Sequence, residues 1–257
     1  MPKPTNAGWR RWSGIFKLFM RIIIILLLTS ATCFAQNEVL KKVSEDFKKE
    51  DYRQAIVRIT DYLNAYKNHD STYLELLHWK LRSYGMLNNQ DSVFFTCVEI
   101  NDKFPSDQIA LIQLGFMYGE AENYERAFYY FQKLRQYYPN DPVGTQNISF
   151  YLNNTGEYET AIKYADTTLA LANDSITLGA AWNNKCYSNI KLGNFSKGKK
   201  NLKASFEFFP NNSYAYRNLA LILIEERKIE EACNALEKAK QLGGFYITEE
   251  LIKEHCK

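Results

Sequence analysis

The sequence predicts an all-α fold, a right-handed solenoid of about six helix-turn-helix hairpins followed by a C-terminal capping helix. Three observations support this class. The 257 residues include 18 Tyr and 16 Phe but only 12 Gly and 6 Pro, which suits helices that pack through large side chains. Large, small and helix-breaking residues recur at a spacing of about 34 residues, as in stacked helical hairpins. The segment after the last repeat carries the signals of one more helix.

Residues 1–35 have the pattern of an export signal. Five cations and no acid precede or flank the apolar run 22–28, and small or polar residues follow as far as Ala35. A basic start, a short apolar centre and a small-residue exit are typical of a secretory signal. We therefore expect cleavage after Ala35. The exit Phe-Ala-Gln resembles signals of Bacteroidetes-like bacteria, which implies an exported protein of the periplasm or cell surface.

Two other fates of this segment stay open. Residues 15–34 form an uncleaved membrane anchor if Lys17 and Arg21 extend their charged ends to the interface. The apolar run is short for this role, because a bilayer-spanning helix needs about 20 apolar residues. In the other alternative, the residues before Cys33 weakly resemble a lipobox, which implies a lipid on that cysteine.

The clearest repeat runs from Gln108 to Asp141. Its marker residues, in order, are Leu111, Leu114, Gly115, Tyr118, Tyr124, Ala127, Phe131 and Pro139. This order is similar to the pattern of the tetratricopeptide-repeat family. The resemblance implies a helical hairpin in which small residues at positions 8 and 20 let the two helices approach, large residues fill the gaps between hairpins, and Pro at position 32 ends the second helix.

Six repeats in this register follow one another along the chain. They span residues 36–69, 74–107, 108–141, 142–175, 179–212 and 213–246. The first two depart most from the pattern, because Asp46 replaces an aromatic residue and because Asn88 and Gln90 replace Gly and Tyr. Since one hairpin cannot bury its apolar face alone, we expect the repeats to stack. Residues 247–257 are expected to form the capping helix, with Thr248 as its N-cap.

Four cysteines follow the export signal. Cys97 and Cys186 fall at repeat positions that predict small core residues. Cys233 and Cys256 lie at equal distances from the turn around Gly244, so their sulfurs are expected at about the same height on two facing antiparallel helices. Height alone does not fix the direction in which the side chains point. The pair is therefore a candidate disulfide in an oxidising compartment.

Neither the charge nor the motifs of the chain indicate nucleic-acid binding or catalysis. Residues 1–35 carry five of the 32 basic residues and none of the 29 acidic ones, so the remainder is slightly acidic and attracts phosphate backbones weakly. The histidines, His69, His78 and His255, have no metal or triad spacing, and no phosphate loop or nucleophile elbow is present. We expect no enzyme, no metal and no cofactor.

The resemblance implies that the first helix of each repeat lines a concave groove that binds a partner. At position 6, four repeats carry an amide side chain, namely Gln113, Asn147, Asn184 and Asn218. The asparagine row resembles the ladder by which the O-GlcNAc transferase array holds an extended peptide. An amide both donates and accepts hydrogen bonds, so it pairs with peptide groups of any sequence.

Aromatic residues flank this row and complete the predicted groove. They are Phe116, Phe150 and Tyr187 at position 9, with Tyr214 and Arg217 beside the last asparagine. Aromatic rings supply apolar contact area. We therefore expect a non-catalytic scaffold that binds a protein or peptide partner in the cell envelope. On this hypothesis, replacing the three asparagines together by Ala removes partner capture without unfolding the protein.

Two alternatives to this hypothesis stay open. The asparagines can instead bond within the array, because Asn is common in the chain. The second alternative is a component of a carbohydrate or nutrient receptor, which an exposed Trp in the groove would favour. Trp182 at position 4 is expected in the core, so only Trp79 is left for such a role. Contact with a membrane is expected only if the N-terminal segment is retained.

Overall fold

The computed structural model describes residues 35–66 and 68–256, and over these residues the chain is helical without any strand. The all-α prediction is thereby confirmed. The export signal and its two alternatives lie, apart from Ala35, outside the described residues. Within the described ranges, no helix combines the length and the apolar character needed to cross a membrane. The described residues divide into two compact parts, an N-terminal part that ends at Phe104 and a C-terminal part that begins at Pro105, and these are described separately below.

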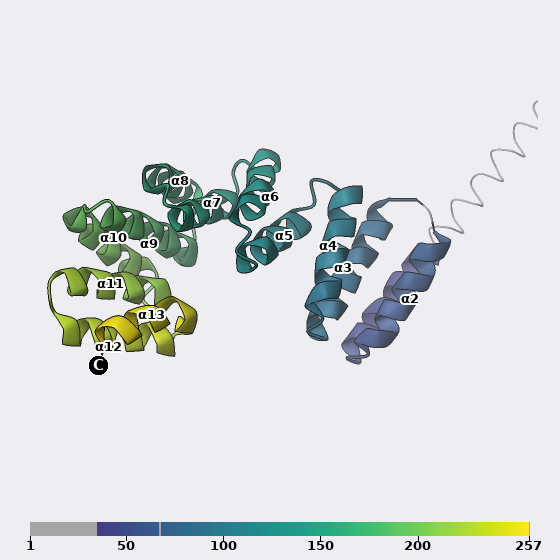
Figure 1. Ribbon diagram of the computed structural model, residues 1–257. Coiled ribbons are helices and arrows are strands. Elements are labelled where there is room, and N and C mark those ends of the chain that lie inside the picture. Colours follow the sequence, from purple (N-terminus) through teal and green to yellow (C-terminus); the bar gives the residue numbers. More distant parts are fainter. Residues whose placement is uncertain (1–34, 67, 257) are drawn as a thin grey trace, which may run out of the picture. The chain divides into compact units, whose positions relative to one another are not determined.

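The N-terminal part contains two helical hairpins (Figure 1). Residues 35–48 are helical and are followed by α2 (Tyr52–Ala65), α3 (Ser71–Met86) and α4 (Gln90–Lys103). Helix α3 packs against both α2 and α4. The side chains of Ile59, Leu76 and Ile100 are fully buried in this part.

The C-terminal part stacks four further hairpins and a final single helix (Figure 1). Each helix packs against the next one along the chain. The helices are α5 (Gln108–Glu120), α6 (Tyr124–Tyr137), α7 (Pro142–Thr155), α8 (Tyr158–Leu171), α9 (Ser175–Lys191), α10 (Phe195–Phe208), α11 (Ser213–Glu225), α12 (Ile229–Gln241) and α13 (Phe245–His255).

The turn inside every hairpin contains one residue with left-handed backbone. These residues are Glu50, Asn88, Glu122, Gly156, Gly193 and Arg227, with φ between 53° and 87°. All of them stand at position 15 of the predicted repeats. Only Gly adopts this conformation without steric cost, so four of the hairpins keep the turn although their residue there is less suited to it. The shape of the hairpin is therefore imposed by packing as well as by local preference.

Helix starts and ends follow capping residues and prolines. Many first turns are capped by an Asp or Asn side chain that accepts a backbone N–H bond, as Asp70 does from Tyr73 (3.0 Å) and Asp174 from Thr177 (2.9 Å). These two caps start α3 and α9 a few residues before the predicted repeats at 74 and 179. Helix α6 ends two residues before Pro139, because the residue before a proline is disfavoured in the helical conformation.

Glycines let neighbouring helices approach closely in the C-terminal part. A Cβ on Gly115 of α5 would lie 2.5 Å from the ring of Phe131 in α6. A Cβ on Gly119, one turn further along α5, would lie 1.9 Å from the hydroxyl of Tyr151 in α7. The ring of Phe131 is fully buried, so it has no open space to move into. The small residue expected at position 8 of the repeat therefore has a direct steric cause.

The capping helix α13 closes the last hairpin and is bonded covalently to it. Cys233 of α12 and Cys256 form a disulfide with a Cα–Cα distance of 5.7 Å. Leu251 and Ile252 pack against the buried cluster around Leu236. Together these contacts cover the apolar face that the last hairpin would otherwise expose.

The predicted role of Thr248 as N-cap is wrong. Helix α13 begins at Phe245, directly after a turn in which Gly243 has left-handed backbone (φ 89°). Thr248 therefore lies inside the helix, where its buried hydroxyl donates to the Gly244 carbonyl (2.9 Å). A threonine that bonds four residues back in this way is a helix-interior residue.

The substitution Gly115→Ala is expected to lower the free energy of unfolding by about 1–3 kcal/mol, since it overpacks a closed core. The matched control is Gly85→Ala in α3, where a Cβ would meet no atom within 4 Å. That substitution is expected to raise stability by about 0.5–1 kcal/mol, because Ala loses less backbone entropy in a helix. Urea unfolding followed by circular dichroism measures both. Equal effects of the two substitutions would contradict the steric explanation.

Reduction of the disulfide is expected to destabilise the C-terminal part by about 3 kcal/mol, the chain-entropy value for a loop of this size. Thermal unfolding with and without dithiothreitol measures the change. The variant Cys233→Ser/Cys256→Ser is the control and is expected to unfold at one temperature under both conditions. If dithiothreitol affects this variant as strongly as the native chain, the stabilisation does not come from the bond.

Candidate functional site

A groove of about 620 Å³ runs along the first helices of the four C-terminal hairpins. We call it the main groove. Six of the predicted binding residues line it, namely Phe116, Asn147, Phe150, Asn184, Tyr214 and Arg217. They come from α5, α7, α9 and α11, so four successive repeats contribute to one surface. Gln113, Tyr187 and Asn218 are not among its lining residues.

Aromatic and aliphatic side chains form the apolar part of the main groove. Phe116 remains 40% exposed and Ile176, at the start of α9, 63% exposed. The rings of Phe150 and Tyr214 meet edge to face, with centroids 5.7 Å apart. This arrangement joins α7 to α11 and fixes the orientation of both rings. The exposed apolar area is therefore held in place before any partner binds.

Two tyrosines of the groove, Tyr151 and Tyr214, stay protonated at neutral pH. Burial raises the pKa of Tyr151 to about 12, and the nearby negative charge of Glu120 adds to the rise. Burial also raises the pKa of Tyr214, although the positive charge of Arg217 opposes this. Both tyrosines line the groove. Their hydroxyl groups therefore act as hydrogen-bond donors there, as well as acceptors.

The asparagine row is bonded mainly within the array, so the simple peptide-ladder hypothesis needs correction. Asn218 is only 1% exposed, and its Nδ2 donates to the carbonyl oxygen (3.3 Å) and Oδ1 (2.8 Å) of Asn183. The Nδ2 of Asn184 donates to the Gln146 carbonyl (3.2 Å), and that of Asn147 donates to Val143 in its own helix (2.9 Å). A buried amide nitrogen is costly without such a partner, and here the partner comes either from a neighbouring helix or from the residue's own helix.

The asparagines at position 6 therefore differ in what they can offer to a partner. Asn218 is enclosed between α9 and α11, and its amide nitrogen cannot serve a peptide. Asn147 and Asn184 still line the groove, but their Nδ2 groups are occupied within the array. Both residues are themselves largely buried, with 8% and 6% of their surface exposed, so only a small part of each reaches the groove.

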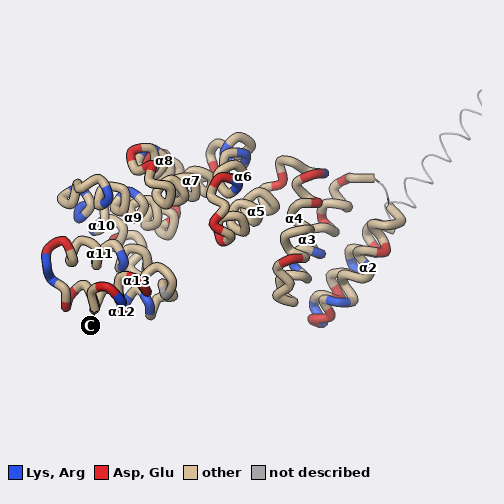
Figure 2. Tube along the Cα trace, viewed as in Figure 1, with Lys and Arg blue, Asp and Glu red and all other residues tan. Residues whose placement is uncertain are grey.

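Arg217 is the cationic residue of the groove and is oriented by an aromatic ring. Its guanidinium lies over the ring of Tyr187, 4.5 Å from the centroid. Tyr187 thus supports the groove from beneath Arg217 instead of lining it. The acidic residues Glu120 and Glu122 line the α5 end of the same groove. Charges of opposite sign therefore stand at the α5 and α11 sides of the groove, and Figure 2 shows the acidic turn after α5.

Several groove residues were not predicted from the sequence. Tyr124, Tyr151 and Phe209 line the groove, as does Ile247 of the capping helix. Tyr151 directly follows Phe150, and adjacent residues on a helix point in different directions, so the repeat pattern favoured only one of them. The glycine at 119, which makes room for the Tyr151 hydroxyl, is the signal that could have indicated this tyrosine.

The remaining candidates for chemistry are separated in the structure. Over the described ranges, no three His, Cys, Asp or Glu residues gather in a way that could hold a metal ion. Cys97 and Cys186 are buried and are not part of the disulfide, and burial raises the pKa of Cys186 to about 12. A buried neutral thiol is a poor nucleophile.

Solved structures with the same fold are tetratricopeptide-repeat proteins. A tetratricopeptide repeat protein from Parabacteroides merdae superposes with a TM-score of 0.57 and 16% identity, over 84% of this chain and 80% of the other. YrrB, described as a TPR protein with an unusual peptide-binding site, gives 0.55 and 14%, over 69% and 88%. The Cut9–Hcn1 complex gives 0.52 and 17%, over 79% of this chain but only 38% of the other.

These likenesses show that the chain has the tetratricopeptide-repeat fold, an all-α solenoid of stacked hairpins. They agree with the resemblance drawn from the repeat spacing. No protein-family model matches the sequence, and no curated protein matches it.

The asparagines are expected to differ in their effect on stability. Asn218→Ala removes two hydrogen bonds to Asn183 and is expected to lower the free energy of unfolding by about 1–2 kcal/mol. Asn147→Ala, the matched control, loses only a bond within its own helix and gains helix propensity, so it is expected to change stability by less than about 0.5 kcal/mol. Urea unfolding measures both. A larger loss in the Asn147 variant would show that the ties between helices are unimportant.

Proposed function

We propose that the main groove binds an extended peptide segment of a partner protein and that the chain acts as a non-catalytic scaffold. The observation that carries the proposal is the groove itself, in which partly exposed aromatic rings, amide side chains and one arginine from four successive repeats line a single surface. The description of YrrB as a peptide-binding protein supports it, since that protein shares the fold. Grooves of this volume accommodate small ligands or a few residues of a peptide.

The polar groups of the groove suit the backbone of such a segment. The Oδ1 atoms of Asn147 and Asn184 can accept bonds from backbone N–H groups, and the hydroxyl of Tyr214 can donate to a backbone carbonyl. These bonds do not depend on the side chains of the partner. The side chains of Phe116, Phe150 and Ile176 offer apolar contact area in the groove. This area favours bound segments that carry large apolar side chains.

We also propose that the protein acts outside the cytoplasm, in the periplasm or at the cell surface. The export pattern of residues 1–35 favours this, and so does the disulfide between Cys233 and Cys256, because such bonds persist in oxidising compartments. Contact with a membrane depends on whether the N-terminal segment is retained.

The receptor alternative receives no support from the groove. Trp79 packs edge to face against Phe47 in the N-terminal part, with centroids 5.1 Å apart. Trp182 lies beneath Lys185, whose Nζ is 5.3 Å from the ring centroid. Neither tryptophan is among the residues that line the main groove. The main groove therefore has no tryptophan ring from the described residues on which a sugar could stack.

Selection from a random peptide display library against the purified protein tests the proposal. Enriched peptides are expected to lose about tenfold or more in affinity with Phe150→Ala, because truncating a buried anchor of an interface costs about 1.4 kcal/mol or more. The control is Tyr129→Ala, an aromatic of α6 that is 55% exposed and lies outside the groove. Fluorescence anisotropy measures both affinities. Peptides that depend on Tyr129 but not on Phe150 would overturn the assignment of the groove.

A further inference from the structure

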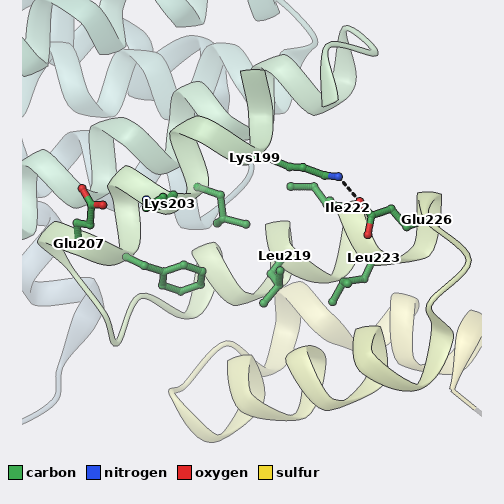
Figure 3. A pocket seen from close by; sticks show the side chains of 9 residues that line it. Lys199, Lys203, Glu207, Leu219, Ile222, Leu223 and Glu226 are labelled. Atoms are coloured by element: carbon green, nitrogen blue, oxygen red, sulfur yellow. Dashed lines mark hydrogen bonds and ion pairs between the residues drawn. The ribbon is translucent and has the colours of Figure 1, made fainter. Parts of the chain in front are cut away.

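A second groove lies between α10 and α11 and shares no residue with the main groove (Figure 3). We call it the α10–α11 groove. Its volume is about 610 Å³. Apolar side chains form its centre, and Lys199, Lys203, Glu207 and Glu226 stand at its borders. The apolar residues are Leu202, Phe206, Leu219, Ile222 and Leu223.

The floor of this groove is rigid because it belongs to the core. Leu202 and Ile222 are buried in the cluster that contains Cys186, and Leu223 is buried in the cluster that contains Leu236. Phe206 and Leu219 are only partly buried, and both pack against these clusters. The ring of Phe206 is held against Tyr216, with centroids 4.9 Å apart. The groove therefore exists before any occupant arrives.

The spacing of the lining residues is that of a helix-packing face. On α10 they stand at 199, 202, 203, 206 and, one residue further, 207; on α11 they stand at 219, 222 and 223, with 226 at its C-cap. Both sets follow the spacing i, i+3, i+4, i+7, by which one face of a helix meets another helix. Two helices that direct such faces into one open groove form a site in which a third helix can pack.

Stacking of hairpins alone does not produce an apolar groove. A pocket of similar size between α6 and α8 is lined mostly by polar side chains, including Gln132, Lys133, Arg135 and Thr167. The apolar centre of the α10–α11 groove is thus a property of these two helices and needs its own explanation.

The charge around the groove is predominantly positive on α10. This helix carries four exposed lysines and one acid, Glu207; the lysines are Lys197, Lys199, Lys200 and Lys203. Figure 2 shows their positions as blue segments of α10. At the end of α11, Glu226 pairs with Lys199 and also with Lys228, the latter at 3.0 Å. The negative charge of Glu226 at this border of the groove is therefore neutralised by two lysines.

We propose that the α10–α11 groove docks an amphipathic helical segment of a partner protein, with apolar residues one turn apart in the groove and Asp or Glu residues facing the lysines of α10. The apolar centre selects the buried face of that helix, and the lysines select its flanks. This site is independent of the main groove, so a protein that uses both would hold two segments at once.

Fluorescence anisotropy with a labelled amphipathic helical peptide tests the proposal. The probe carries Leu residues on one face and Glu on both flanks. It is expected to bind the full protein and to lose about tenfold or more in affinity with Lys200→Glu/Lys203→Glu, and less with the milder Lys200→Gln/Lys203→Gln. The control Lys238→Glu, on α12, and the main-groove variant Phe150→Ala are both expected to leave the affinity unchanged.

Two further peptides separate the contributions of charge and apolar contact. A peptide with Ser in place of Leu is expected not to bind, and one with Lys in place of Glu is expected to bind only the Lys200→Glu/Lys203→Glu variant. Equal binding of all the peptides, or binding that Phe150→Ala removes, would overturn the proposal. Self-association of the native chain that the lysine variant abolishes would also overturn it, since the occupant would then be a second copy. Failure of the main-groove experiment leaves these outcomes unaffected.

Discussion

The close approach of neighbouring helices at small residues is the constraint on which the C-terminal part depends. A Cβ on Gly119 would overlap the hydroxyl of Tyr151, and one on Gly179 would overlap the Cβ of Phe209. Tyr151 and Phe209 both line the main groove. The missing side chains of two glycines thus fix both the spacing of the helices and the rings that reach the groove. Larger residues at these positions would separate the hairpins and displace the lining of the site together.

Hydrogen bonds of polar side chains also join successive first helices of the C-terminal part. Asn153 donates to the Asn184 carbonyl (3.0 Å), and Ser188 donates to the Oδ1 of Asn153 (2.6 Å). Asn218 of α11 likewise donates to the Oδ1 of Asn183 in the preceding repeat (2.8 Å). Such buried polar ties tolerate only one register, because a shift would leave each amide without a partner. Asn183 and Asn184, which line the groove, therefore also take part in the bonds that hold the repeats in alignment.

The hairpins could be predicted from the sequence because their packing rules are periodic. Gly115, Phe131 and Pro139 stand at positions where only small, large or breaking residues fit, and the spacing alone places them. The start of a helix is determined by its local capping residue and not by the repeat spacing. Asp70 and Asp174 therefore start α3 and α9 a few residues before the predicted repeats begin. The direction of a side chain is not periodic in the same way. Asn147 and Asn218 share one repeat position, but only the structure separates a groove-lining amide from an enclosed one.

The capping helix has a role in the groove as well as in covering the last hairpin. Ile247 of α13 lines the main groove, and α13 is joined to α12 by the bond between Cys233 and Cys256. Stacking of the repeats requires only noncovalent contacts, whereas full attachment of this wall requires an oxidation step. If the groove binds a partner as proposed above, formation of this bond is expected to stabilise one wall of the binding surface. Thiol oxidation, in addition to folding, is therefore a step in forming the wall that α13 supplies.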